Sequence, residues 1–193
     1  MSHAVIVCHP RPSSFTHAVS AAYREALAGR GGEVVLRDLY ALAFDPVLKA
    51  SEIPGSAGFA PAPDVLAERA VLAPCRSFTF IYPLWLNAMP AMLKGYLDRV
   101  FGVGFAFAPG PRGPVPQLAG KSLVLVTLSG APTDWLERTG QFDAIEKLQG
   151  EYLTALSSLT LKAHVHCGYV VPGMTATAAE KHLAAVRAAA ASV

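Results

Sequence analysis

The stretch SFTFIYPLWLNAMPAMLKGYLDRVF (77–101) joins an apolar run to an amphipathic one. Its first part, SFTFIYPLW (77–85), is short and rich in aromatic residues, which is typical of a strand buried on both faces of a parallel sheet. Its second part, AMPAMLKGYLDRVF (88–101), repeats apolar residues at helical spacing, and Pro90 suits the first turn of a helix. The stretch therefore predicts a strand, a loop and a helix in succession, which is the building unit of an α/β sheet.

Apolar runs of the same kind recur on both sides of this stretch, with helical patterns between them. The other predicted strands are residues 3–9, 33–40, 121–130 and 163–171. The other predicted helices are residues 14–32, 143–162 and 177–191. This alternation predicts an α/β fold: a doubly wound, five-stranded parallel sheet with helices on both faces, in one domain over residues 1–193. Two Pro- and Gly-rich segments, 41–64 and 102–117, are too long for ordinary connections and predict functional loops or interface arms.

The composition excludes several classes of protein. The 193 residues carry a formal net charge of +2 without a basic run, so we expect no nucleic-acid partner. No apolar stretch reaches the ~18 residues that span a bilayer, so we expect no membrane insertion. The N-terminus lacks the pattern of a signal peptide. The cysteines, Cys8, Cys75 and Cys167, are too scattered for a disulfide framework or a zinc site, so a reducing cytoplasm is the expected location.

Two histidines share one predicted strand. His164 and His166 flank Val165, and the alternation of side chains along a strand places both on one face. Two such ligands without a nearby cysteine or carboxylate make a poor metal site, so we expect no metal.

Ligands of open α/β sheets bind at the carboxyl ends of the strands, where the order of winding switches. After the first strand, CHPRPSSFTHA (8–18) opens a helix with several hydroxyl groups, and His9 and Arg11 add charge. Main-chain N–H groups at a helix start favour an anion, so this end suits a phosphate. Simple N-capping by Ser13 or Ser14 is the alternative interpretation.

The third and fourth strand ends carry features that suit a flat ring. Residues 83–87 place main-chain polar groups beside flat apolar side chains, which fits a heteroaromatic ring such as an isoalloxazine. Thr127, Ser129 and Gly130 could close over its other edge, because a glycine permits close approach and the hydroxyls can donate. The alternatives are core packing for Leu84 and Trp85 and a simple turn for 127–130.

The central stretch also resembles a known family. YPLWLNAMPAMLKGYLDRVFGVGFAF (82–107) is similar to the signature segment of the NAD(P)H:quinone oxidoreductases, and weaker similarities extend over nearly the whole chain. The resemblance implies a flavodoxin-like fold and a homodimeric flavoenzyme. It implies hydride transfer from NADPH or NADH to a quinone or a similar planar acceptor in a ping-pong cycle. FAD is the implied cofactor, with FMN as the alternative.

The resemblance also assigns residues by position. On the phosphate side it implies His9, Ser14, Phe15 and Thr16. Around the ring it implies Pro83, Leu84, Trp85, Leu86, Asn87, Thr127, Leu128, Ser129 and Gly130. Trp85, Phe105 and Phe107 are the implied walls of the substrate pocket, with the two phenylalanines reaching the pocket of the partner subunit. The segment after the third loop lacks the tyrosine and histidine of the larger animal enzymes, so no catalytic residue is assigned.

Two other functions remain open at this point. Some members of the family are flavin-bearing ancillary subunits of potassium-efflux transporters. A one-electron carrier of the flavodoxin type is the third hypothesis, although carriers are usually acidic and this chain has a charge of +2. The mean hydropathy of +0.36 fits a large apolar dimer face, formed by helix 88–101 and the loop after it.

Overall fold

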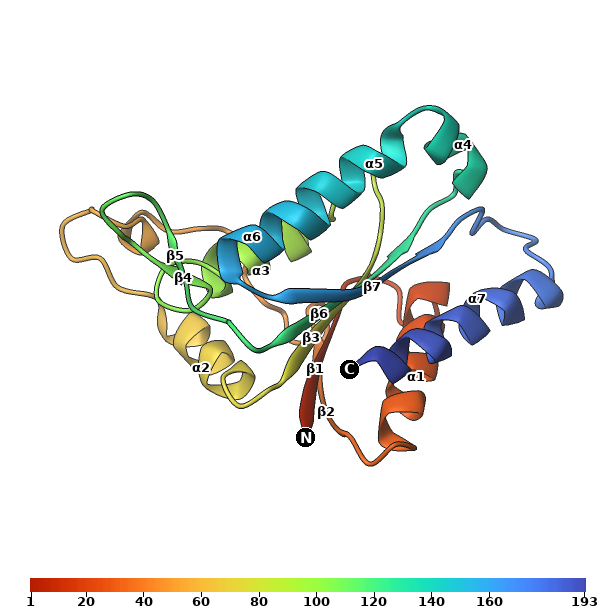
Figure 1. Cartoon of the computed structure of the whole chain (residues 1–193), viewed down its shortest axis with the longest axis horizontal. Coiled ribbons are helices and arrows are strands. Elements are labelled where there is room, and N and C mark those ends of the chain that lie inside the picture. Colours follow the sequence, from red (N-terminus) through yellow and green to blue (C-terminus); the bar gives the residue numbers. More distant parts are fainter.

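In the computed structural model, which describes residues 1–193, five strands form one sheet in the order β2-β1-β3-β6-β7 (Figure 1). These strands are β1 (Ser2–Val7), β2 (Glu33–Asp38), β3 (Ser77–Pro83), β6 (Ser122–Leu128) and β7 (Thr160–Cys167). Every neighbouring pair in the sheet is parallel. The predicted doubly wound five-stranded parallel sheet is therefore confirmed, and the winding order switches between β1 and β3, as expected of a flavodoxin-like fold.

The centre of the sheet is buried on both faces. All residues of β3 are buried, and so are Ala4 to Val7 of β1. The outer strand β2 is only partly covered, with Glu33 and Leu36 exposed. Continuous apolar runs are stable only where helices cover both faces of a sheet, which explains why the central runs are the most apolar ones.

Helices α1 (Phe15–Ala28) and α7 (Ala176–Ala189) lie side by side on one face of the sheet (Figure 1). The other face carries α2 (Pro63–Leu72), α3 (Ala91–Val100) and a long helix. The long helix consists of α5 (Gln141–Ile145), a π-helical segment η2 (Glu146–Glu151) and α6 (Tyr152–Ser157). The remaining elements are η1 (Ala50–Glu52), β4 (Phe107–Ala108), β5 (Val115–Pro116), α4 (Thr133–Arg138) and η3 (Ala190–Ser192).

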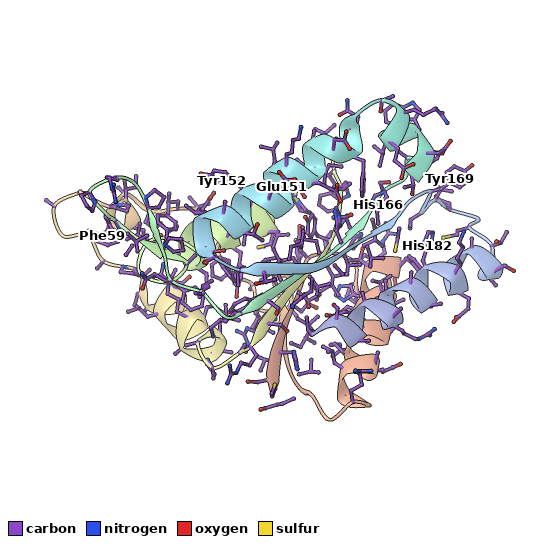
Figure 2. All side chains as sticks on the ribbon, in the orientation of Figure 1. Phe59, Glu151, Tyr152, His166, Tyr169 and His182 are labelled. Atoms are coloured by element: carbon purple, nitrogen blue, oxygen red, sulfur yellow. The ribbon has the colours of Figure 1, made fainter.

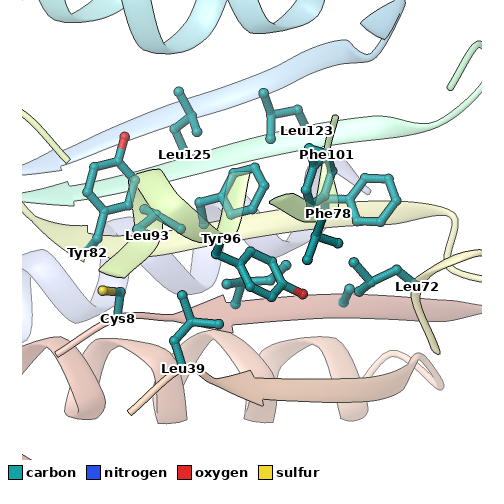
Figure 3. Close-up of a cluster of buried hydrophobic side chains, with 14 of the residues drawn as sticks. Cys8, Leu39, Leu72, Phe78, Tyr82, Leu93, Tyr96, Phe101, Leu123 and Leu125 are labelled. Carbon is teal, nitrogen blue, oxygen red and sulfur yellow. The ribbon is translucent and has the colours of Figure 1, made fainter. Parts of the chain in front are cut away.

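The core under α3 is built from aromatic rings (Figure 3). Phe101 meets Phe78 edge to face at 5.2 Å between ring centroids, and Phe80 at 5.4 Å. Tyr96 is fully buried and its hydroxyl bonds to Glu68 of α2 at 2.9 Å. These contacts fix α3, and therefore the loop that precedes it, against strand β3.

Several predicted boundaries were wrong. Helix α2 begins at Pro63, inside segment 41–64, and was not predicted, although a proline suits the first turn of a helix. The helix predicted to end at residue 162 ends at Ser157, because Ser158 adopts a left-handed conformation (φ 62°). Strand β7 then runs from Thr160 to Cys167 instead of from 163 to 171. Segment 102–117 contains the short antiparallel pair β4–β5.

The segment 41–64 is anchored on helix α3 by the buried guanidinium of Arg99. Arg99 donates to Glu52 at 3.0 Å, to Asp64 at 2.7 Å and to the carbonyl oxygen of Asp45 at 2.5 Å. The segment is therefore a fixed part of this face. No helix of the structure has the length and apolarity to cross a membrane.

Candidate functional site

A cavity of about 430 Å³ lies at the carboxyl ends of β1, β3 and β6, where the winding order switches. The residues that line it are His9, Arg11, Ser13, Ser14, Phe15, Thr16, Pro83, Leu84, Trp85, Leu128, Ser129, Gly130, Val170, Val171 and Pro172. We call it the rim cavity. The three turns that the sequence placed at one edge of the sheet thus surround one space.

The first side of the rim cavity is the start of helix α1. The side chain of Ser14 accepts a hydrogen bond from the N–H of His17 at 3.3 Å and caps the helix. The N–H groups of Phe15 and Thr16 have no acceptor within the chain. These N–H groups and the positive end of the helix dipole make this side suitable for an anion.

His9 is held in a single orientation beside this helix start. Its Nδ1 accepts a hydrogen bond from the N–H of Arg11 at 3.0 Å, so the neutral ring carries its hydrogen on Nε2. The ring meets Trp85 edge to face at 5.9 Å between centroids. Partial burial lowers the pKa of His9, so the first and second turns meet through a neutral imidazole at pH 7.

The second side is a two-residue hairpin turn after β3. Trp85 and Ala88 exchange two backbone hydrogen bonds of 3.1 Å, and the residues between them, Leu86 and Asn87, have φ values of 51° and 60°. Left-handed φ at both central positions defines a type I′ turn, which usually contains glycine. The N–H groups of Leu86 and Asn87 have no partner in the chain, and the Leu86 side chain is fully exposed. The turn therefore presents two free donors and a strained leucine at the rim.

The third side is the turn after β6. The carbonyl of Leu128 accepts from the N–H of Leu84 at 2.6 Å. The N–H of Ser129 donates to the carbonyl of Cys167 at the end of β7, and the carbonyl of Ser129 accepts from the N–H of Val170. The N–H of Gly130 has no internal acceptor, and a Cβ added at Gly130 would touch only Val171, at 3.9 Å. The space beside Gly130 therefore belongs to the cavity and is not filled by the protein.

A second cavity of about 290 Å³ adjoins the first across Leu84, Ser129 and Gly130. Leu86, Asn87, Ala131, Trp135, Leu136 and Gln141 complete its lining. Asn87 donates from Nδ2 to Oε1 of Gln141 at 3.1 Å, so the hairpin turn is tied to helix α5. Leu86 and Asn87 thus lie on the far side of the turn from the phosphate end.

Thr127 does not lie at the ring site where the sequence analysis placed it, while the predicted place of Phe105 and Phe107 in the pocket of the partner subunit stays a prediction. Thr127 is fully buried below the cavity, where its hydroxyl bonds to His164 and His166, because it precedes the strand end and points toward β7. Phe105 packs edge to face on Phe101 at 5.4 Å in the core. Phe107 lines a separate groove, and neither phenylalanine lines the rim cavity of its own chain.

The sequence analysis missed the wall formed by Val170, Val171 and Pro172 after β7. Their only signal was the position of β7 beside β6 in the sheet, which places its carboxyl end at the same edge. Trp135 and Gln141, which line the second cavity, come from helices whose arrangement the sequence did not predict.

Comparisons with known proteins point to one group of enzymes. An uncharacterized NAD(P)H oxidoreductase of Haemophilus influenzae is 35% identical over 108 residues, which are 55% of this chain and 54% of that protein. NAD(P)H dehydrogenase (quinone) 1 of Rattus norvegicus is 31% identical over 147 residues, 66% of this chain and 53% of that protein. The chain therefore spans about half the length of these curated relatives.

A solved structure covers the whole fold. The NAD(P)H:quinone oxidoreductase from Methanothermobacter marburgensis superposes with a TM-score of 0.85 at 28% identity, over 98% of this chain and 97% of the other. The named relatives confirm the resemblance to NAD(P)H:quinone oxidoreductases, and none of them is named as a transporter subunit. Because residues 1–191 match the family described as flavodoxin-like fold, the chain belongs to that family.

Proposed function

We propose that the protein is a flavin-dependent oxidoreductase that carries a hydride from NADPH or NADH to a quinone or a similar planar acceptor in a ping-pong cycle. The bound flavin supplies the redox chemistry, because its ring accepts a hydride from a nicotinamide and releases it to an acceptor. The observation that carries the proposal is that unpaired main-chain N–H groups from three strand ends lie around two adjoining cavities, which share Leu84, Ser129 and Gly130. The names of the relatives support the same reaction.

In this proposal the start of α1 binds the phosphate of the flavin. The free N–H groups of Phe15 and Thr16 donate to it, and the hydroxyl of Ser14 can donate while its oxygen caps the helix. Arg11, from the same turn, adds a positive charge on this side of the cavity. His9 closes the end of the cavity against Trp85.

The hairpin turn and the turn after β6 hold the ring. The N–H groups of Leu86, Asn87 and Gly130 are free to bind polar ring edges, and Trp85 offers an apolar surface. Pro83, Leu84, Leu128 and Ser129 complete this part of the wall. Thr127 acts from below through its bonds to the β7 histidines, without touching the ring.

FAD is the proposed cofactor and FMN the alternative. The choice rests on the resemblance of residues 13–16 to FAD-binding members of the family. The hydride donor is NADPH or NADH, and a quinone or another planar acceptor enters the same cavity in the second half of the cycle. Heat release of the flavin followed by chromatography distinguishes FAD from FMN.

We also propose that the protein works as a homodimer. A groove of about 610 Å³ runs between α3 and the long helix, and Phe107 and Leu97 lie in its apolar lining. Leu148 and Tyr152 on the long helix are 71% and 64% exposed, and Figure 2 shows Tyr152 beside Glu151 on this helix. A second copy of the chain seated on this groove would bury these apolar side chains and bring the partner's Phe107 toward the substrate. Sedimentation as a monomer at micromolar concentration would contradict the homodimer.

A cytoplasmic location and a single flavin-binding domain over residues 1–193 complete the proposal. The three cysteines support a reducing compartment, because all are buried and unpaired. Neither a transporter subunit nor a one-electron carrier is favoured by any feature of the rim cavity.

The proposal is tested on the purified protein. A yellow protein that bleaches on anaerobic addition of NADPH or NADH, and regains its colour with benzoquinone, is the expected result. A coloured protein that reacts with neither nicotinamide would favour a carrier or a subunit instead. A protein that binds neither FAD nor FMN would overturn the proposed function altogether.

A further inference from the structure

A chain of hydrogen bonds runs under the floor of the rim cavity from strand β6 to strand β7. The Oγ1 of Thr127 lies 2.9 Å from Nε2 of His164 and 2.9 Å from Nδ1 of His166. The Nε2 of His166 lies 2.9 Å from Oγ of Ser129, which lines both cavities. At the other end, Nδ1 of His164 lies 3.5 Å from Oε1 of Glu146 on η2.

The direction of these hydrogen bonds follows from one fixed point. The hydroxyl of Ser129 lies 2.8 Å from the carbonyl oxygen of Ala131, and a carbonyl can only accept, so Ser129 donates there. Ser129 therefore accepts from Nε2–H of His166, whose Nδ1 is left bare and accepts from the hydroxyl of Thr127. Thr127 in turn accepts from Nε2–H of His164. Every bond in the chain then points the same way, from His164 toward Ser129.

The two imidazoles are neutral at pH 7, which the assignment requires. Burial, with smaller contributions from the neighbouring His164 and from His182 of α7, lowers the pKa of His166 to about 4. Burial also lowers the pKa of His164, against the opposing effect of Glu146. Phe142 of α5 stacks on His164 at 5.2 Å and an interplanar angle of 14°, and it also meets His166 edge-on at 5.5 Å. These groups shield the chain from water, and Figure 2 shows His166 between β7 and the long helix.

The two ends of the chain differ. Nδ1 of His164 is buried and has no hydrogen-bond donor, so its lone pair is the open end of the chain. The Glu146 side chain in front of it is 45% exposed, so it can take a proton from water and offer it to Nδ1. At the other end, Ser129 is 8% exposed, and its hydroxyl reaches the cavity by turning away from Ala131.

We propose that Glu146, His164, Thr127, His166 and Ser129 form a proton relay from the surface to the rim cavity. This inference rests on the proposed function, in which NAD(P)H supplies the hydride. Reduction of a quinone to its quinol takes up that hydride and one proton, and this proton enters from water. The relay supplies this proton: each member receives a hydrogen at one atom and releases one at the other, and Ser129 delivers the last to the bound ligand. His164, Thr127 and His166 are relay residues, and only Ser129 touches the ligand.

The test compares Thr127→Val, which keeps the shape but removes the hydroxyl, with Thr127→Ser, which keeps the hydroxyl. Stopped-flow measurement at pH 8 separates reduction of the protein by NADPH from its reoxidation by benzoquinone. We expect Thr127→Val to slow reoxidation about 10²-fold, the lower end of what a positioned proton donor contributes, and to change its solvent isotope effect. Reduction by NADPH consumes no proton and should stay unchanged, and Thr127→Ser should restore reoxidation.

A second pair of variants serves if Thr127→Val does not fold. Glu146→Gln removes the group that takes up the proton, and Glu151→Gln, on the same π-helical segment, leaves the chain intact. We expect only Glu146→Gln to slow reoxidation. Equal reoxidation rates and isotope effects in wild type, Thr127→Val and Glu146→Gln would overturn the relay while leaving the reductase intact.

A measurement on the flavin-free protein tests the chain without catalysis. Nitrogen NMR of the histidine rings should show His166 neutral, with its hydrogen on Nε2, at pH 7. A hydrogen on Nδ1 instead would contradict the direction of the chain and overturn the relay. A wild-type protein that binds no flavin, or is not reduced by either nicotinamide, would overturn the proposed function and the relay with it.

Discussion

Trp85 and Ala88 face each other across a two-residue turn and exchange two backbone hydrogen bonds of 3.1 Å. The residue after Trp85, Leu86, has a φ of 51° and a fully exposed side chain. A leucine gains nothing from packing there and loses about 1 kcal/mol to its left-handed conformation. Strain of this kind persists where function requires it, and both residues of the turn line the second cavity with N–H groups that have no partner in the chain.

We predict that Leu86→Asn stabilises the flavin-free protein. Asparagine tolerates the left-handed region better than leucine, so the free energy of unfolding should rise by a sizeable part of that ~1 kcal/mol. Urea denaturation of both proteins measures the difference. A less stable variant would show that Leu86 makes a contact in the free protein, against its complete exposure.

We predict that Gly130→Ala weakens flavin binding. The added Cβ meets only Val171, at 3.9 Å, so the fold tolerates it, but it occupies space beside the ring. A tenfold rise in Kd, about 1.4 kcal/mol, is the expected size, and titration with FAD followed by fluorescence measures it. Gly29→Ala, at the other end of helix α1, is the matched control. Equal affinity in all three proteins would remove Gly130 from the site.

Helix α3 tolerates no side chain at Gly95. A Cβ there would collide with the backbone carbonyl of Pro46, which lies directly against the helix. Because this neighbour is backbone and cannot move aside, we predict that Gly95→Ala costs about 3 kcal/mol of stability. Lys94→Ala, at the next position, removes only an exposed ion pair with Asp98 and should cost under about 1 kcal/mol. Thermal denaturation of both variants measures the two losses of stability. Equal stability of the two variants would show that segment 41–64 does not lie against α3.

The ion pairs of Arg99 make stability fall in acid. Hydrogen bonds from Arg99 hold the pKa of Asp64 below its usual value. Burial alone would raise the pKa of Glu52, but the bonds from Arg99 outweigh this effect and lower the pKa of Glu52 as well. A carboxyl whose pKa is lowered by folding stabilises the protein above its unfolded pKa, and the stabilisation is lost as the pH falls below it. We therefore expect the free energy of unfolding to decrease from about pH 5 downward.

Arg99→Met tests the same cluster. It leaves Glu52 buried without its partner, so we predict a loss of about 3–5 kcal/mol at pH 7 and a smaller loss in acid, where Glu52 is protonated. Denaturation at a series of pH values measures both curves. Parallel curves for wild type and variant would contradict a role for Arg99 in the acid dependence.

The sequence predicted the sheet because its strands are short apolar runs buried on both faces, as in β3. Helix α2 escaped prediction because it begins inside a segment rich in proline and glycine. The end of α6 depends on the left-handed Ser158, and no glycine marks that position. Boundaries of this kind depend on tertiary packing, which local propensity does not contain.

The candidate site was predictable where it follows from topology. Adjacent parallel strands bring Ser14, Trp85 and Ser129 to one edge, and spacing alone indicated this. The burial of Thr127 and its bonds to His164 and His166 were not predictable, because they depend on the register of β6 against β7. Through this register His164 and His166, which the sequence analysis considered only as metal ligands, lie next to the site.

The absorption spectrum of the flavin-loaded protein, recorded anaerobically before and after one equivalent of NADPH or NADH, tests the central claim most directly. We predict a flavin spectrum that bleaches with at least one of the two nicotinamides and returns when benzoquinone is added. A spectrum that neither nicotinamide changes, or a protein that retains no flavin after gel filtration, would contradict the account.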